Sequence, residues 1–412
     1  MYDWANSAFA TTIMAAVLPI YYSDVAAKTL TKTLATSYWG YTQSIAMLVV
    51  AISAPILGAM ADYSRAKMKF LKFFVFLGAI FTASLYFIRT GDYLLCSIMY
   101  IIADLGFAGG NVFYNALLPE ITTKDNIDWV STLGFALGYF GGGILLLINI
   151  MMIQFPKLFF IPNATIAARL SFTSVGIWWL LFSMPIFRNV RDRVSITNKR
   201  RNVNYVSIGF ERVFNTFREI RKYKELFKFL LAFWIYNDGI STIIVMATIY
   251  GRSIGIGRGD LLGALLMTQF IGIPCSLLFG KLAHKIGTRN GIYLALSVYA
   301  LIAFWGFFMK TAITFWILAG LVGLVQGGSQ ALSRSLFATL TPLRKDAEFF
   351  GFYGISSKLS AIIGPFIFAL LGQLTGSTRI GIFALVAFFL IGILVLSRVN
   401  IEEGRKIARE ES

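Results

Sequence analysis

Three ionisable side chains lie inside long apolar stretches of the sequence: the acids Asp104 and Asp238 and the cation Lys358. A charged group costs about 2.5 to 3.5 kcal/mol at the centre of a membrane helix, so such residues usually face a partner or a water-filled cavity. Asp104 is therefore the first candidate for proton exchange and Asp238 the second, the alternative for each being an acid that packs helices together. Lys358 is expected to pair with one of these acids, in a switch or in a purely structural ion pair, or to bind the carboxylate of a ligand.

Amide and hydroxyl side chains accompany these acids at helical spacing. Asn111 follows Asp104 by two turns, which places both residues on roughly one face of a helix. Asn237 directly precedes Asp238, and Thr242 follows it by one turn. Polar groups on such a face can meet a polar ligand inside an otherwise apolar protein.

The segment around Asn237 has a weak copy at the start of the chain. Residues 2–13 and 234–244 share an amide and a hydroxyl at one constant offset, the pairs being Asn6 with Asn237 and Thr11 with Thr242. The string Gly109-Gly110-Asn111 likewise has a counterpart in Gly327-Gly328-Ser329. Weak repeats in the same order predict two halves related by an axis along the membrane normal, with these polar groups lining a site between helices.

Twelve apolar stretches are long enough to carry these residues across a membrane. The chain has 412 residues, of which 57% are hydrophobic, and this composition is that of an integral membrane protein. We therefore expect an all-α membrane protein with twelve transmembrane helices in two pseudo-symmetric six-helix bundles. The predicted spans lie near 2–22, 38–61, 70–89, 93–117, 129–154, 169–187, 229–250, 259–280, 290–309, 312–337, 349–373 and 379–397.

The basic residues are distributed unevenly around these stretches. The formal charge of +17 comes from 37 Lys and Arg, most of which fall on one predicted side of the membrane. This bias predicts that both termini lie in the cytoplasm, and it accounts for the charge without a nucleic-acid partner. Short loops and the lack of an organelle-targeting segment favour a bacterial inner membrane, with a vacuolar membrane as the alternative.

A basic linker separates the two halves. We predict an N-terminal bundle over 1–187, a cytoplasmic linker over 188–228, a C-terminal bundle over 229–398 and a cytoplasmic tail over 399–412. Within the linker, Phe210, Phe214 and Phe217 recur at helical spacing, which suggests a helix lying against anionic lipid. A solvated basic loop is the alternative interpretation.

Three strings give the chain a family resemblance over essentially its whole length. Tyr2–Phe9, Gln326–Ser335 and Ala347–Tyr353 resemble the major facilitator superfamily, in the branch related to the fungal vacuolar amino-acid effluxer of autophagy. The superfamily's loop motif after span two is matched only in part, at Gly58, Asp62 and Lys67. The resemblance implies a monomeric secondary transporter that moves a small metabolite by alternating access, amino acids being the first guess and efflux the expected direction, with protons as the candidate coupling ion.

The resemblance also implies residues that gate the cytoplasmic side. It places Asp62, beside Arg65, near the start of span eleven around Glu348, where a carboxylate is stabilised by free helix N–H groups. Arg334 would face Glu348 as a gate pair or extend to the membrane surface. A solvated loop acid is the alternative for Asp62.

Other classes of function lack the residues that they need. The sequence has no phosphate-binding loop, and its one histidine, His284, has no metal-ligand neighbours. Cys96 and Cys275 fall within spans and are expected to be inert. We therefore expect no enzyme activity, no metal and no cofactor. A receptor that keeps the transporter fold without transport is the competing hypothesis.

Overall fold

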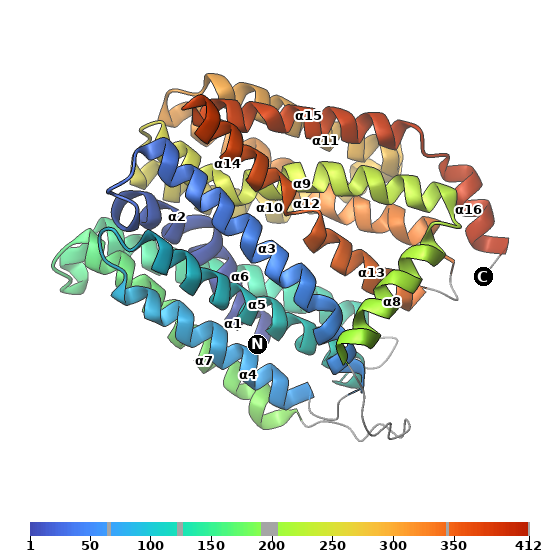
Figure 1. Ribbon diagram of the computed structural model, residues 1–412, viewed down its shortest axis with the longest axis horizontal. Coiled ribbons are helices and arrows are strands. Elements are labelled where there is room, and N and C mark those ends of the chain that lie inside the picture. The colour runs from blue at the N-terminus through green and yellow to red at the C-terminus, as the bar shows by residue number, and fades with distance from the viewer. Residues whose placement is uncertain (64–66, 122–126, 191–204, 343–345, 411–412) are drawn as a thin grey trace. The chain divides into compact units, whose positions relative to one another are not determined.

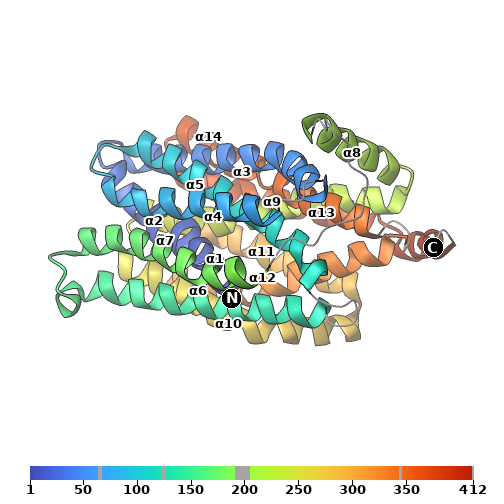
Figure 2. The ribbon, with the colours of Figure 1, turned by 90° about the horizontal axis from the view of Figure 1, so that it is seen from below.

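The computed structural model describes the backbone of the chain except at residues 64–66, 122–126, 191–204, 343–345 and 411–412. Side chains are also left undescribed at 61–63, 116, 118–121, 127–136, 139, 273, 276–284, 346–348 and 351. Every element in the described part is a helix (Figures 1 and 2). The predicted all-α fold class is confirmed.

The helices form two compact units, each with its own core. Unit 1 comprises Met1–Thr31 and Leu48–Arg212, and unit 2 comprises Lys32–Met47 and Val213–Ser412. The division differs from a simple cut in the linker, because the first part of the second span belongs to unit 2. The long helix that carries it, α3 (Lys32–Tyr63), also begins six residues before the predicted start of span two at residue 38.

Unit 1 contains the first span and the helices up to the linker. The first span is assembled from α1 (Tyr2–Ala8), η1 (Phe9–Ala16), α2 (Val17–Tyr21) and η2 (Tyr22–Ala26). After the second part of α3 come α4 (Lys67–Ser84), η3 (Leu85–Phe87), α5 (Tyr93–Ile121), α6 (Ile127–Gln154), η4 (Pro156–Phe159) and α7 (Ala164–Asn189).

Unit 2 contains the helices that follow the linker, together with the first part of α3. These helices are α9 (Lys224–Ser253), α10 (Arg258–Ile286), α11 (Thr288–Phe308), α12 (Ala312–Leu340), α13 (Asp346–Leu359), α14 (Ile363–Thr375), α15 (Thr378–Ser397) and α16 (Ile401–Glu410). The linker helix α8 (Tyr205–Ile220) is divided between the units. Helix α8 lies within the predicted linker, and its contact with lipid stays a prediction.

Ten segments of the described residues are long and apolar enough to cross a membrane. Helices α6 and α10 occupy the two remaining predicted stretches. A break in span eleven makes that crossing from two helices, α13 and α14, which Figure 1 shows as separate segments. Helix α16 adds a short helix to the tail after the last span.

Glycines set how closely the helices of unit 1 approach one another. A Cβ atom placed on Gly106 of α5 would lie 2.5 Å from the Cα atom of Gly78 in α4, so neither residue has room for a side chain. On α6, a Cβ atom on Gly142 would lie 3.0 Å from the carbonyl oxygen of Ser7 in α1. This is the close backbone approach that small residues permit in membrane helices.

The first span departs from regular α-helix geometry in its middle. Residues Phe9–Ala16 form a π-helix, a widened form that is rare and often found at functional sites. Pro19 follows within α2 and has no N–H group to donate to the carbonyl of residue 15. The π-helical turns and Pro19 therefore lie in the same span as Asn6 and Thr11.

Candidate functional site in two polar helix pairs and a broken span

Asn6 and Asn111 join the first and fourth spans inside unit 1. The Asn6 side-chain amide Nδ2 donates a hydrogen bond to Oδ1 of Asn111 at 2.6 Å, linking α1 to α5. Asn6 is buried, with 5% of its surface exposed, so the bond forms largely away from solvent. The structure therefore joins Asn6, which the internal repeat identified, to Asn111, which shares a predicted helix face with Asp104.

A second hydrogen bond joins the same two helices close by. The hydroxyl of Tyr114, one turn after Asn111 on α5, donates to the Oδ2 carboxylate oxygen of Asp3 on α1. The ring of Tyr2 lies against that of Tyr114, with 4.5 Å between their centroids. Tyr114 was not predicted from the sequence to belong to this contact, although its spacing from Asn111 places it on the same face of α5. An acid, two amides and two phenols therefore lie at one helix–helix contact.

Asp104 and Thr11 are buried elsewhere in unit 1. Asp104 lies two turns before Asn111 on α5, and 1% of its surface is exposed. Thr11 donates to the carbonyl oxygen of Gly142 on α6 at 3.2 Å, and so connects α6 to the π-helical part of the first span. Thr11 thus has a packing contact in the structure, whereas Asp104 is a buried acid inside a membrane helix.

Unit 2 contains a matching hydrogen bond between spans seven and ten. The hydroxyls of Tyr236 on α9 and Ser333 on α12 lie 2.7 Å apart, and both residues are buried. Ser333 donates to the carbonyl oxygen of Ser329, so the Tyr236 hydroxyl is the donor to Ser333. Ser329 is the residue that the repeat pairs with Asn111. Each unit therefore joins its first and fourth spans through polar side chains, which are partly buried in unit 1 and buried in unit 2, but the residue types differ.

The amide and acid of span seven contact the broken span eleven. Nδ2 of Asn237 donates to the Ser360 hydroxyl at 2.7 Å, and Oδ1 of Asp238 accepts the backbone N–H of Gly364 at 2.8 Å. Thr242, one turn later, donates to the backbone carbonyl of Asp238 at 2.7 Å. Asn237 and Asp238 thus reach the two sides of the break, and Thr242 is engaged within its own helix.

Lys358 lies in the last turn of α13, two residues before the break, and its side chain is exposed. Among the described residues, no ion pair joins it to Asp238, whose carboxylate accepts from the backbone of Gly364 instead. The expected pairing of Lys358 with Asp238 is therefore not what the structure contains. The difference arises because the break in span eleven exposes a backbone N–H group that the sequence pattern did not reveal.

Of the predicted gating residues, Arg334 alone has a side chain that the structure describes. Arg334 is exposed on α12, and its guanidinium carbon lies 5.9 Å from the ring centroid of Phe350 on α13. The side chains of Asp62, Arg65 and Glu348 lie outside the described residues. Their gating role stays a prediction. Across the described part of the chain, no group of three or more His, Cys, Asp or Glu residues could hold a metal ion.

Residues 1–409 match the family described as vacuole effluxer Atg22 like. The chain belongs to this family. It is 40% identical over 414 residues to an uncharacterized MFS-type transporter, YxiO, of Bacillus subtilis, in an alignment that covers all of this chain and 96% of the relative. Autophagy-related protein 22 of Kluyveromyces lactis is 25% identical over 411 residues, covering 90% of this chain and 81% of that protein.

Solved structures show the same fold. A D-xylose-proton symporter superposes with a TM-score of 0.72 over 98% of this chain and 97% of its own, at 13% sequence identity. This similarity concerns the fold alone, because pocket side chains and not the fold determine the cargo. Together with the family match, it confirms the predicted resemblance: the member of the Atg22-like family described here is a transporter of the major facilitator type.

Proposed function

We propose that this Atg22-like transporter exports a small zwitterionic metabolite, amino acids first, and that protons couple to the movement. Alternating access, in which two repeats rock around a site near the middle of the membrane, is the mechanism that this fold uses. The family's description as effluxers supports export as the direction. The chain would act as a monomer in a bacterial plasma membrane with both termini in the cytoplasm.

The observation that carries the proposal is the pair of polar contacts, one partly buried and one buried, at equivalent helices of the two units. Asn6 and Asn111 join α1 to α5, and Tyr236 and Ser333 join α9 to α12. Amides and hydroxyls can donate and accept, so they suit the charged ends of a zwitterion without a permanent charge of their own. Helices held by side chains of this kind can exchange a protein partner for a ligand at little net cost in hydrogen bonds.

The charged ends of an amino acid have suitable partners in the chain. The exposed ammonium group of Lys358 is available to a carboxylate, and an embedded acid is available to an ammonium group or a proton. Asp3 adds such an acid at the contact between spans one and four, through its hydrogen bond with Tyr114. Asp104 is the second acid in unit 1 that we assign to proton exchange.

Gating on the cytoplasmic side is assigned to the family block and the loop after span two. Asp62 and Arg65 would contact the start of span eleven near Glu348 when that side is closed, and Arg334 would pair with Glu348. The exposure of Arg334 on α12 supports this assignment, since an exposed guanidinium is available to an incoming carboxylate.

Flux measurements in proteoliposomes test the proposal. Purified protein is reconstituted, a panel of radiolabelled amino acids is loaded, and release is followed with and without an imposed pH gradient, while a trapped fluorescent dye reports internal pH. We expect gradient-dependent release of at least one amino acid, together with movement of protons. Asp104→Asn should remove the dependence of release on the pH gradient. Asp260→Asn should not, because Asp260 belongs to neither the Asn6–Asn111 nor the Tyr236–Ser333 contact. Gradient-dependent release that is unchanged in Asp104→Asn would exclude that residue, and absence of release for the whole panel would exclude the proposed cargo.

A further inference from the structure

Span eleven is broken just before the pair Gly364-Pro365. Helix α13 ends at Leu359 and α14 begins at Ile363. Pro365 has no N–H group, and in a continuous helix its ring would collide with the carbonyl of Ala361, four residues earlier. The proline favours a break without imposing one, since α3, α7 and α10 continue past Pro55, Pro185 and Pro274. The break leaves backbone groups without helical partners at both new ends.

The new ends are satisfied by side chains from another helix. Ile362 occupies the N-cap position of α14 and has no side-chain acceptor for the first N–H groups. Asp238 of α9 supplies one instead, since its Oδ1 atom accepts the Gly364 N–H at 2.8 Å and it is 3% exposed. A buried carboxylate at a helix N-terminus is also favoured by the helix dipole.

Asn237 holds the opposite side of the break. Its Nδ2 atom donates to the Ser360 hydroxyl at 2.7 Å and approaches the carbonyl oxygen of Ser357, in the last turn of α13, at 3.4 Å. Two adjacent residues of α9 therefore contact the end of α13 and the start of α14. No room remains at this point, because a Cβ atom on Gly364 would overlap with Oγ1 of Thr242 and would lie 2.7 Å from Oδ1 of Asp238.

The two helices on either side of the break pack against different parts of unit 2. On α14, the carbonyl oxygen of Ala369 accepts from the Ser37 hydroxyl of α3 at 2.9 Å, and Gln373 accepts from Tyr41 at 2.7 Å. On α13, Tyr353 stacks on Phe337 of α12 with 4.6 Å between ring centroids. Thus α14 is attached to the Lys32–Met47 segment and, through Phe368, to Tyr250 of α9 and Gly381 of α15, whereas α13 is attached to α12.

We propose that Asn237 and Asp238 form a clamp that fixes the angle between α13 and α14, with Ser360–Ile362 as a hinge. Releasing the clamp lets α14 and the attached Lys32–Met47 segment turn together against α13. The two residues are then positioning residues for transport rather than residues that bind the cargo. The clamp concerns unit 2 alone and can be tested without a transported solute, so its failure is distinguishable from a failure of the proposed cargo.

Amide hydrogen exchange of the protein in lipid nanodiscs tests the clamp directly. In Asp238→Ala the Gly364 N–H loses its acceptor, and we expect exchange over residues 360–366 to rise about tenfold, as the loss of a buried hydrogen bond to a charged group implies. The matched control is Asp260→Ala, because Asp260 also accepts from a neighbouring helix, through Trp316, but away from the break. Equal exchange over 360–366 in the two variants would overturn the proposal.

A second variant separates release of the clamp from general unfolding. In Asp238→Ala/Pro365→Ala, both the cap and the proline are gone, so span eleven can close into one helix and residues 363–364 can bond within it. We expect exchange over 360–366 to fall below that of Asp238→Ala. If the second substitution raises exchange further, the effect is loss of structure and the clamp is excluded.

The angle itself can be measured by spin labelling. Gly354 of α13 has nothing within 4 Å of a Cβ atom, and Leu374 of α14 is 73% exposed, so cysteines at these positions tolerate a label. With the two native cysteines replaced, we expect one narrow distance distribution for the otherwise native chain and a broad one for Asp238→Ala. Identical distributions would contradict a clamp that fixes the angle.

Discussion

Asn6 donates a 2.6 Å hydrogen bond to Asn111 across 105 residues of sequence, and this bond joins the first and fourth spans of unit 1. Both partners are amides, so each can donate and accept, and neither requires a charge in the membrane. The bond is therefore stable without a counter-ion and is suited to being exchanged for a polar ligand.

Removing one amide of this pair should destabilise unit 1. Asn111→Ala leaves the buried Asn6 amide without its acceptor, at a cost of about 1 to 3 kcal/mol in the free energy of unfolding. Thermal melting in detergent measures the effect, and Asn115→Ala, an exposed amide on the same helix, is the control. The double variant Asn6→Ala/Asn111→Ala should cost less than the sum of the single variants; strict additivity would mean that the two side chains do not interact.

Loss of the Tyr114 hydroxyl should affect the acid to which it donates. Tyr114→Phe keeps the ring contact with Tyr2 but removes the hydrogen bond to Asp3. Because hydrogen bonds to charged groups contribute about 1.5 to 3 kcal/mol, we expect flux driven by a pH gradient to change by about tenfold or more. Proteoliposome release is the measurement. Tyr86→Phe, on η3, is the control, and an equal response of the two variants would remove Tyr114 from the site.

A side chain at Gly106 should disrupt the contact between α4 and α5. The Cβ atom of Gly106→Ala would lie 2.5 Å from the Cα atom of Gly78, so the two backbones must separate. Overpacking of this kind costs about 1 to 3 kcal/mol. Gly143→Ala provides the matched control, because nothing lies within 4 Å of a Cβ atom there. Melting temperatures of the two variants should differ by several degrees, and similar melting would show that the helices separate without cost.

Sequence patterns predicted the helices and some of the residues in the polar contacts. The partners that they did not predict depend on the three-dimensional arrangement of the helices. The repeat identified Asn6 and Asn237 because a side-chain type at a fixed offset is visible in one dimension. Lys358 was predicted to pair with Asp238 or Asp104, or to bind a ligand carboxylate, yet Asp238 accepts from the backbone of Gly364, and a backbone donor becomes available only where a helix is interrupted. Gly364-Pro365 was the signal for that interruption.

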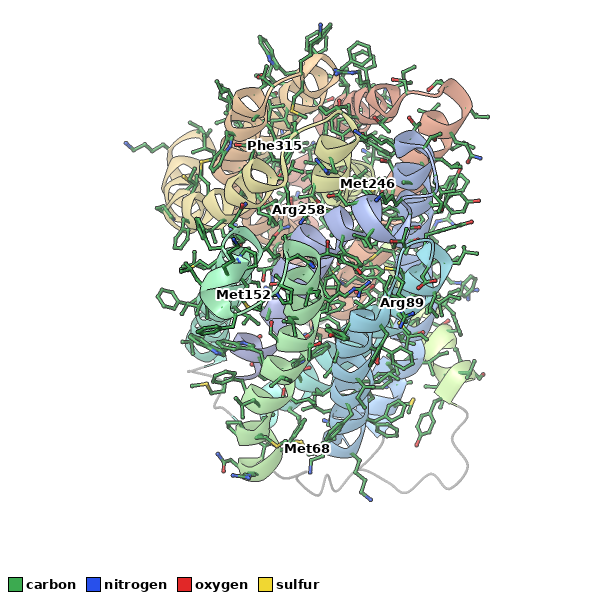
Figure 3. The ribbon with its side chains drawn as sticks, turned by 90° about the vertical axis from the view of Figure 1, so that its left-hand side faces the viewer. Met68, Arg89, Met152, Met246, Arg258 and Phe315 are labelled. Carbon is green, nitrogen blue, oxygen red and sulfur yellow. The ribbon has the colours of Figure 1, made fainter. Side chains whose placement is uncertain are left out.

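Other contacts were missed because they depend on how helices rotate against one another. Tyr114 lies outside the strings that carried the resemblance, and Ser333 lies inside one that gave it no partner; only the facing of α5 to α1 and of α12 to α9 gives them partners. The assignment of Lys32–Met47 to unit 2 has the same origin. A hydropathy pattern predicts that a helix exists, but its packing face is decided by close contacts such as that of Gly40, where a Cβ atom would lie 3.3 Å from Cε of Met246, labelled in Figure 3.

A disulfide between α3 and α14 should form within unit 2. The Ser37 Oγ atom lies 3.3 Å from the position of a Cβ atom on Gly372, close to the separation between Sγ and the opposite Cβ in a disulfide. With Cys96 and Cys275 replaced, we expect Ser37→Cys/Gly372→Cys to cross-link under mild oxidation, which mass spectrometry of proteolytic peptides detects. Because α14 and the attached Lys32–Met47 segment are proposed to turn together, the cross-link should leave transport at the native rate. Each single-cysteine variant cannot form this cross-link and therefore shows the effect of the oxidant alone on transport. A cross-linked chain that no longer transports, with transport restored by reduction, would show that α3 and α14 separate during the cycle and would contradict their joint movement.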